Sequence, residues 1–330
     1  MRFGFAVPHY DCSIAGANPL PFATTLEYAK TAERVGFDSL WVSDHLTWDL
    51  NKYGGGPQTY GVFEALSTLA AIARATTTAR VGSLVLCEAI RPPAVLAKSL
   101  ATIDRFSSGR LDVGLGAGWY APDYEAVGMT MPSPGTRLSR LDNYLSVLLP
   151  MLAGAAPVTV ADEFYSVVGA TNNPPPQQTK VPVFIGGKGD RLLRMIARHG
   201  LGWNTCWAWT LDDYRERKVA LDQACEAIGR DPATIWRSLG LYALCGEDEQ
   251  DLQRRFDRLV QLTPPGVLNG MTLERWRQGR LVGTVQQIRE QAEEWGSLGI
   301  ETIIACIGSV PFQATTLDDL ELLGHALTGA

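Results

Sequence analysis

The stretch that decides the fold reads Leu111-Asp112-Val113-Gly114-Leu115-Gly116-Ala117-Gly118-Trp119-Tyr120. Its apolar first half is typical of a strand buried in a parallel sheet. The glycines let the following turn approach a ligand without Cβ atoms in the way, and the Trp-Tyr pair offers a flat surface. From this stretch alone two interpretations stay open: Ala117 and Gly118 belong to a cofactor pocket, or the turn is an ordinary strand-to-helix connection.

Working outward, strand and helix patterns alternate eight times along the chain. Eight such units predict an α/β protein with a closed (β/α)8 TIM barrel, in which helices cover parallel strands. Two irregular segments, at about 154–180 and 263–280, interrupt the alternation. Because the alternation resumes after each of them, we interpret them as insertions and expect residues 1–330 to form a single domain. The expected strands are 2–8, 39–42, 80–85, 111–115, 181–185, 202–205, 236–245 and 302–306.

Composition narrows the classes of partner. The net charge is −6 and the pI about 5.3, which argues against nucleic acid and anionic membranes as partners. The longest apolar runs fall short of the ~18 residues that a membrane span needs. Six scattered cysteines without a Cys-x-x-Cys pair predict neither a disulfide framework nor a metal site. The chain enters a strand pattern directly after Met1, so we expect a cytoplasmic protein.

In such a barrel the chemistry lies at the carboxyl ends of the strands. Ser43-Asp44-His45 follows the second strand. Histidine exchanges protons near neutral pH, so His45 is a candidate catalytic residue, and we hypothesise that Asp44 orients it. His9 follows the first strand as a candidate substrate contact, and Glu88 follows the third as a candidate acid or base. The alternative for each is a packed or surface side chain.

Two further features belong to the same set of loops. Gly186-Gly187-Lys188 precedes a helix, where free N–H groups and the helix dipole favour a phosphate; a plain glycine-rich turn is the alternative. Trp48, Trp119 and Trp207 follow three different strands. They are expected to wall an apolar cleft for a planar ring and a small-molecule substrate, although a core cluster would explain each of them singly.

Several longer runs give the chain a family resemblance over nearly its full length. It resembles the bacterial luciferase-like family of flavin- and deazaflavin-dependent barrel oxidoreductases. The most specific run is Thr102-Ile103-Asp104-Arg105-Phe106-Ser107-Ser108-Gly109-Arg110, followed by the glycine-rich turn quoted first. The other matching runs are residues 41–45, 91–98, 114–119 and 183–189.

Within this family, Ser-Asp-His after the second strand resembles the branch that uses coenzyme F420. The resemblance implies that His45 lies beside the deazaflavin as proton donor or acceptor. It also implies that a non-proline cis peptide backs the ring, here at Ser83–Leu84. The matching glycine turns would hold the cofactor phosphate with Ala117, Gly118, Gly186 and Gly187, and Lys188 adds a positive charge.

Two departures bear on the substrate. Trp119 stands where the F420-dependent sugar-phosphate dehydrogenases have a glutamate, and Trp48 stands three residues past His45 rather than four. We therefore expect an apolar or aromatic substrate that exchanges a hydride with F420. The alternative is an FMN-dependent monooxygenase supplied by a separate cofactor reductase, and a third is a binding barrel without catalysis. Family members are commonly dimers, so a homodimer is expected.

Overall fold

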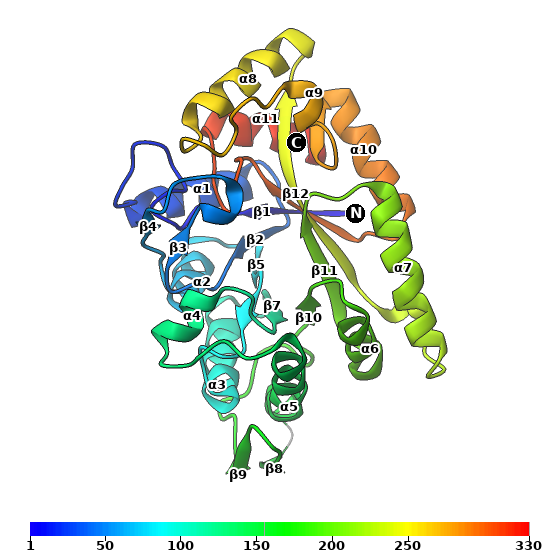
Figure 1. The fold of residues 1–330 in the computed structure, drawn as a ribbon. Helices are drawn as coiled ribbons and strands as arrows, with labels where there is room; N and C mark the ends of the chain where they lie inside the picture. Colours follow the sequence, from blue (N-terminus) through cyan, green and yellow to red (C-terminus); the bar gives the residue numbers. More distant parts are fainter. Residues whose placement is uncertain (155, 330) are drawn as a thin grey trace.

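The strands close into a ring in the computed structural model, which describes residues 1–154 and 156–329 (Figure 1). Each barrel strand pairs in parallel with the next, and the last pairs with the first, for example Ile303 with Phe3. The predicted (β/α)8 barrel is therefore confirmed. Its strands are β1 (Arg2–Ala6), β2 (Ser39–Val42), β5 (Arg80–Ser83), β7 (Leu111–Gly116), β10 (Val183–Gly186), β11 (Gly202–Trp207), β12 (Arg237–Gly246) and β14 (Thr302–Cys306).

Helices surround the ring, as Figure 1 shows. Local sequence sets their ends: the Thr210–Asp213 and Thr284–Gln287 pairs form reciprocal capping boxes at two helix starts, which satisfy N–H groups that the helix leaves unpaired. The covering helices are α1 (Phe22–Arg34), α2 (Ala65–Ala75), α3 (Pro93–Phe106), α5 (Pro134–Ala153), α6 (Asp190–His199), α7 (Leu211–Glu226), α8 (Glu249–Leu262), α10 (Val285–Ser297) and α11 (Leu317–Thr328).

Alternation along the strands divides the buried residues into two clusters. One packs the outer faces of the strands against the helices. The other fills the barrel interior and continues to α8 and the 263–280 segment. Trp41 of β2 is fully buried in the interior cluster. Gly4 and Gly82, on the two neighbouring strands, make room for it, because a Cβ on either would lie within 2.4 Å of the indole. The barrel is thus a packed core, and a ligand has to bind at its mouth.

The segments 154–180 and 263–280 both contain short regular elements, and in the first the two short β-like pieces around Ala161-Asp162-Glu163 that the sequence indicated are found. The first holds an antiparallel hairpin, β8 (Val158–Ala161) and β9 (Ser166–Ala170), which projects past α3 and α5 in Figure 1. The second holds the one-turn helix α9 (Leu273–Trp276). The short elements that the sequence did not predict are β3 (Trp48–Asp49), η1 (Asn51–Tyr53), β4 (Thr59–Tyr60), β6 (Leu86–Cys87), α4 (Ala121–Ala126), η2 (Pro232–Thr234) and β13 (Leu281–Thr284).

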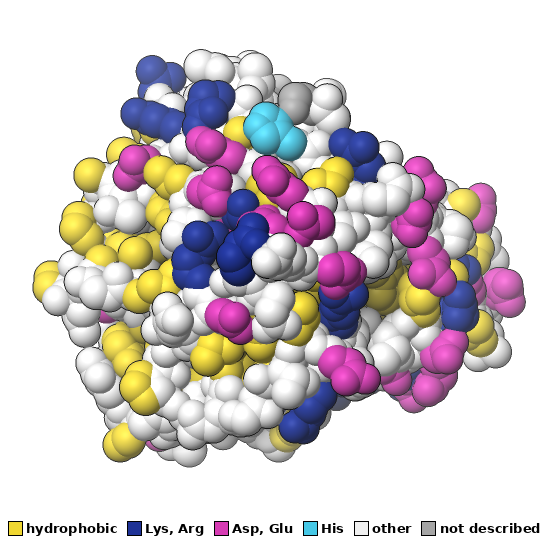
Figure 2. All heavy atoms as spheres, turned by 90° about the horizontal axis from the view of Figure 1, so that it is seen from above, with side chains coloured by type: hydrophobic (Ala, Val, Ile, Leu, Met, Phe, Trp, Pro, Cys, Tyr) yellow, Lys and Arg dark blue, Asp and Glu magenta, His cyan; other side chains and the backbone are white. Residues whose placement is uncertain are grey.

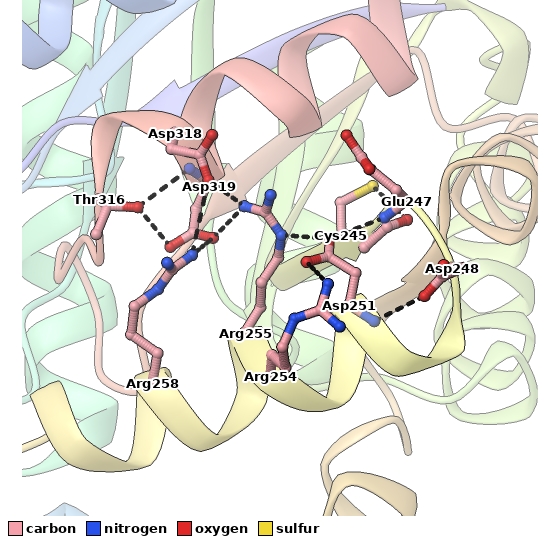
Figure 3. A network of polar contacts seen from close by, with 11 residues as sticks. Cys245, Glu247, Asp248, Asp251, Arg254, Arg255, Arg258, Thr316, Asp318 and Asp319 are labelled. Atoms are coloured by element: carbon pink, nitrogen blue, oxygen red, sulfur yellow. Dashed lines mark hydrogen bonds and ion pairs between the residues drawn. The ribbon is translucent and has the colours of Figure 1, made fainter.

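On the face that carries α8 and α11, basic and acidic side chains lie next to one another (Figure 2). Beneath them, Arg255 of α8 pairs with Asp251 and reaches Asp318 and Asp319 at the start of α11 (Figure 3). This network ties α8 to α11. No helix in the part of the chain that the structure describes combines the length and apolar character needed to cross a bilayer.

Candidate active site

A cavity of about 490 Å³ opens at the carboxyl ends of the barrel strands. It is large enough for a cofactor ring or a small substrate. Loops that follow most of the strands contribute to its wall, so residues far apart in the sequence meet there. The predicted site residues among its lining are His45, Trp48, Leu84, Ala117, Gly118, Trp119, Gly186, Gly187, Lys188 and Trp207.

The side chain of His45 contacts that of Asp123 of α4, with 2.6 Å between Nδ1 of the imidazole and Oδ2 of the carboxylate. The other oxygen, Oδ1, accepts a hydrogen bond from the backbone N–H of Leu46 at 2.8 Å. Both side chains are nearly buried, yet both line the cavity. Because Nδ1 is bound to the carboxylate, Nε2 is the ring nitrogen left to exchange a proton with a ligand.

Asp44 does not orient His45, contrary to the sequence-based hypothesis. Its two oxygens accept a forked pair of hydrogen bonds from Arg91, at 2.7 and 3.0 Å, and a third bond from the backbone N–H of Cys87. Asp44 therefore fixes the loop after β5 to the loop after β2. Sequence proximity suggested the wrong carboxylate, because the partner of His45 lies 78 positions further along the chain.

The three tryptophans form the aromatic wall that the sequence predicted. Trp48 is buried, and its ring centroid lies 4.5 Å from that of His45. Trp119 is 45% exposed. The ammonium group of Lys52 lies over its ring, 4.0 Å from the ring centroid. Trp207, on the other side, stacks on Tyr242 at 5.5 Å. The cavity thus offers flat apolar surfaces on two sides.

The floor of the cavity contains a non-proline cis peptide, but at Leu84–Val85 rather than at the predicted Ser83–Leu84 bond. The sheet explains the offset. Ser83 Oγ exchanges hydrogen bonds with Gly114 on β7, and the N–H of Leu84 still donates to Val42 on β2. The chain therefore leaves the ladder only after Leu84, and Ser83 lies beneath the cavity rather than in its lining.

Two glycines explain how Val85 fits against this floor. A Cβ on Gly116 or on Gly186 would lie within 3.0 Å of a Val85 methyl group. The glycines that the sequence assigned to a cofactor turn therefore also accept the side chain of the bulge. A second non-proline cis bond, Cys206–Trp207, lies in the cavity wall; nothing in the sequence indicated it.

His9 lies behind the cavity wall and does not line it; the substrate contact expected for it stays a prediction. It is fully buried, and Nδ1 donates to the carbonyl of Val7. Burial lowers the pKa of His9 to about 4, so the ring is neutral at pH 7. Nε2 faces Ser43 Oγ at 3.1 Å, and Ser43 in turn bonds the hydroxyl of Tyr10, which does line the cavity.

Glu88 is likewise absent from the cavity lining. Its side chain is buried, one oxygen accepts from the Tyr165 hydroxyl at 2.7 Å, and the other faces Arg140 at 3.4 Å. Burial raises the pKa of Glu88, although Tyr165 and Arg140 oppose the shift. Because Tyr165 belongs to the 154–180 insertion, the structure gives Glu88 a part in holding that insertion, and the expected acid–base role lacks a contact with the cavity.

The opposite end of the cavity is formed by the residues that precede α6. Gly189, the residue before the helix, provides no side-chain cap, so the first N–H groups of α6 are open to an anion. Lys188 lines the cavity, and its ammonium lies 5.3 Å from the ring centroid of Trp209. This end has the polarity that a phosphate needs, and the phosphate site itself stays a prediction.

Comparisons with known proteins fit this geometry. The family model described as luciferase-like monooxygenase matches residues 1–302. An F420-dependent glucose-6-phosphate dehydrogenase of Kineococcus radiotolerans is 31% identical over 224 residues, which are 67% of this chain and 64% of that relative. The chain therefore matches slightly less than two thirds of that relative's length.

Two solved structures have the same fold over almost the whole chain. The monooxygenase RslO1 from Streptomyces bottropensis has a TM-score of 0.77 at 19% identity, covering 100% of this chain and 99% of its own. An F420-dependent secondary alcohol dehydrogenase, solved with an F420–acetone adduct, also has a TM-score of 0.77 at 19% identity, covering 99% and 98%. At these identities the likeness shows the fold alone.

Proposed function

Since the chain belongs to the luciferase-like monooxygenase family, we propose that it is an F420-dependent oxidoreductase acting on a small apolar or aromatic molecule. The observation that carries the proposal is the His45–Asp123 pair in the wall of a cavity whose floor is the Leu84–Val85 bulge. The relative named as an F420-dependent dehydrogenase supports the choice of cofactor.

The residues present fit such a cofactor. A planar ring can lie on the Leu84–Val85 floor between aromatic walls, and its phosphate-bearing tail can reach Gly186, Gly187 and Lys188 at the uncapped start of α6. Ala117 and Gly118 border the same cavity across from that helix. Gly118 has φ = 67°, a backbone conformation that favours glycine.

When bound, F420 supplies a two-electron hydride carrier. The chain supplies position and a proton. Asp123 holds the His45 imidazole with Nε2 available, so His45 gives a proton to the reduced substrate atom or takes one from an alcohol. Trp48, Trp119 and Trp207 exclude water and orient a flat substrate.

The test compares His45→Ala with wild type in hydride transfer followed by the absorbance of the oxidised deazaflavin. Loss of a general acid–base group lowers turnover by about 100-fold or more, while the F420 dissociation constant changes little. His199→Gln is the matched control, because His199 pairs with Asp142 outside the cavity. An Asp123→Asn variant should shift the pH profile of turnover. Wild-type turnover by His45→Ala would remove the imidazole from the mechanism.

The alternative function, a monooxygenase using reduced FMN from a separate reductase, is supported by the fold shared with RslO1. Titration of the cofactor-free protein with reduced F420 and reduced FMN separates the two. Tight binding of F420 without FMN supports the proposal, whereas tight binding of FMN without F420 reverses it.

A further inference from the structure

A second cavity, of about 350 Å³, adjoins the first one. The two share Lys52, Tyr53, Cys206 and Trp207 in their lining. The outer wall of the second cavity comes from the 263–280 insertion, through Val267, Leu268, Met271, Trp276 and Arg280. A molecule whose reacting end lies in the first cavity can therefore extend under this insertion.

Arg280 is the notable group in the second cavity. Its guanidinium lies 4.1 Å from the ring centroid of Trp276 and 5.7 Å from that of Tyr242. Nη1 donates to the carbonyl oxygens of Trp276 and Gln278. Among residues 1–154 and 156–329 no acid forms an ion pair with Arg280, and its buried Nε has no hydrogen-bond partner. Burial accordingly lowers the pKa of Arg280.

The rest of the lining of the second cavity also favours a negatively charged ligand. Its lining contains no Asp or Glu in the described part of the chain, whereas Lys52 adds a second cation. The indole N–H of Trp276, a side chain that is 2% exposed, has no acceptor among the described residues. A buried donor without an acceptor and a partly buried cation without a carboxylate partner are costly, so an anionic ligand that pairs with the cation gains affinity.

We infer that the second cavity binds the carboxylate of a planar, largely apolar substrate. Nη1 donates to carbonyls, whereas neither Nε nor Nη2 donates to any described residue, and two parallel N–H donors match the two oxygens of a carboxylate. Trp207, Tyr242 and Trp276 provide flat walls for the conjugated part of the molecule. That the reacting end of the substrate lies in the first cavity rests on the proposed function. The anion site in the second cavity does not depend on the proposed function.

F420 carries carboxylates in its own tail, so the same chemistry has a second source. The uncapped start of α6 follows β10, whereas Arg280 follows β12. Only β11 lies between these two strands, and Trp209, whose ring is beside the Lys188 ammonium, donates its backbone N–H to Gly279 next to Arg280. The second experiment below therefore distinguishes the two sources of the carboxylate.

The first experiment uses the cofactor-free protein, so it does not depend on turnover. Calorimetric titration compares cinnamate with its neutral amide, and 2-naphthoate with its amide. We expect the wild-type protein to bind each acid at least tenfold more tightly than its amide. Arg280→Gln should abolish that preference, and Arg280→Lys, which keeps the charge but not the fork, should retain only part of it.

Arg275→Gln is the matched control, because Arg275 lies exposed on α9 outside both cavities. It should bind the acids as the wild type does. Equal binding of acid and amide, binding of neither, or an unchanged preference in an Arg280→Gln variant that melts like wild type would each overturn the assignment.

The second experiment separates the two sources of carboxylate. F420 and the deazaflavin lacking the phosphate and glutamate tail are titrated into wild type and Arg280→Gln. Unchanged F420 affinity in the variant supports the substrate site. Weaker binding of F420 but not of the tail-less ring would assign Arg280 to the cofactor and overturn it. Failure of the wild type to bind F420 at all would contradict the proposed function while leaving the carboxylate site standing.

Discussion

Arg255 is buried and Arg280 is partly buried, and the two cations have opposite surroundings. Arg255, whose side chain is 9% exposed, donates to Asp251, Asp318 and Asp319, each at 2.7 Å (Figure 3). Arg280 faces aromatic rings and two carbonyl oxygens, with no carboxylate among the described residues. Arg255 therefore contacts three carboxylates, whereas Arg280 contacts none among the described residues.

The difference separates a structural role from a binding role. A buried charge matched by carboxylates within the fold holds elements together, and removal of one partner leaves the others desolvated and unpaired. A buried charge that the fold leaves unmatched beside a cavity stabilises nothing by pairing, so its favourable partner has to come from outside. The predictions below test this distinction in order of expected effect.

The largest effect is expected for Arg255→Gln. It removes the one cation that pairs with both Asp251 and Asp319, which are left with Arg254 and Arg258 respectively, and breaking a buried pair costs about 3 kcal/mol. Urea unfolding measures the change in free energy. Arg254→Gln is the control, since Arg254 is 61% exposed and, within the described part of the chain, pairs with Asp251 alone. It should change stability by less than about 0.5 kcal/mol. If Arg255→Gln and Arg254→Gln change the free energy of unfolding by the same amount, the structural role of the Arg255 network is contradicted.

The next prediction concerns pH. Burial alone would raise the pKa of Asp319, but hydrogen bonds, including those from Arg255 and Thr316, outweigh it and the pKa is lowered. Its stabilising contribution is therefore present above the unfolded pKa, about 3.9, and lost as pH falls through the lower folded value. The gap between wild type and Asp319→Asn, about 2 kcal/mol at pH 7, should shrink below pH 4 in urea unfolding; a constant gap would contradict the assignment.

Most of the barrel could be predicted because the hydrophobic pattern of its strands and helices is a local signal in the sequence. The pairing of its charged side chains could not be predicted. The strand 39–42 and the helix 93–106 were predicted with the bounds that the structure gives, because apolar periodicity and a proline at the helix start are local signals. Asp123 lies in a six-residue helix within a loop without periodicity, so its contact with His45 had no local signal. The tryptophans and glycines of the mouth were predicted by their positions after strands.

The insertion after β12 shows the same limit. Its sequence indicated an irregular segment, and neither the strand β13 that follows it nor the partial burial of Arg280 could be predicted. Both depend on tertiary contacts: Leu281 pairs with Ala243 of β12, and Arg280 is covered by Trp276 and Tyr242. An arginine in a loop is ordinarily solvated, so only the three-dimensional structure distinguishes this one.

A smaller effect is expected from occupancy of the second cavity. A ligand at ten times its dissociation constant stabilises the folded state by about 1.4 kcal/mol. Cinnamate should therefore raise the melting temperature of the wild type, and cinnamamide at the same concentration should not. In Arg280→Gln the two compounds should behave alike. A rise of equal size in that variant would show that the acid binds elsewhere.

The smallest effect is expected for the stability of Arg280→Gln without ligand. The substitution removes a partly buried cation that has no carboxylate partner among the described residues, which is favourable. It also removes a cation–π contact worth about 0.5–2 kcal/mol, which is unfavourable. Because the two changes oppose each other, the free energy of unfolding should stay within about 1 kcal/mol of wild type. Urea unfolding beside Arg255→Gln checks this directly. If both variants lose the same stability, Arg280 is a structural residue like Arg255, and the contrast between the two arginines fails.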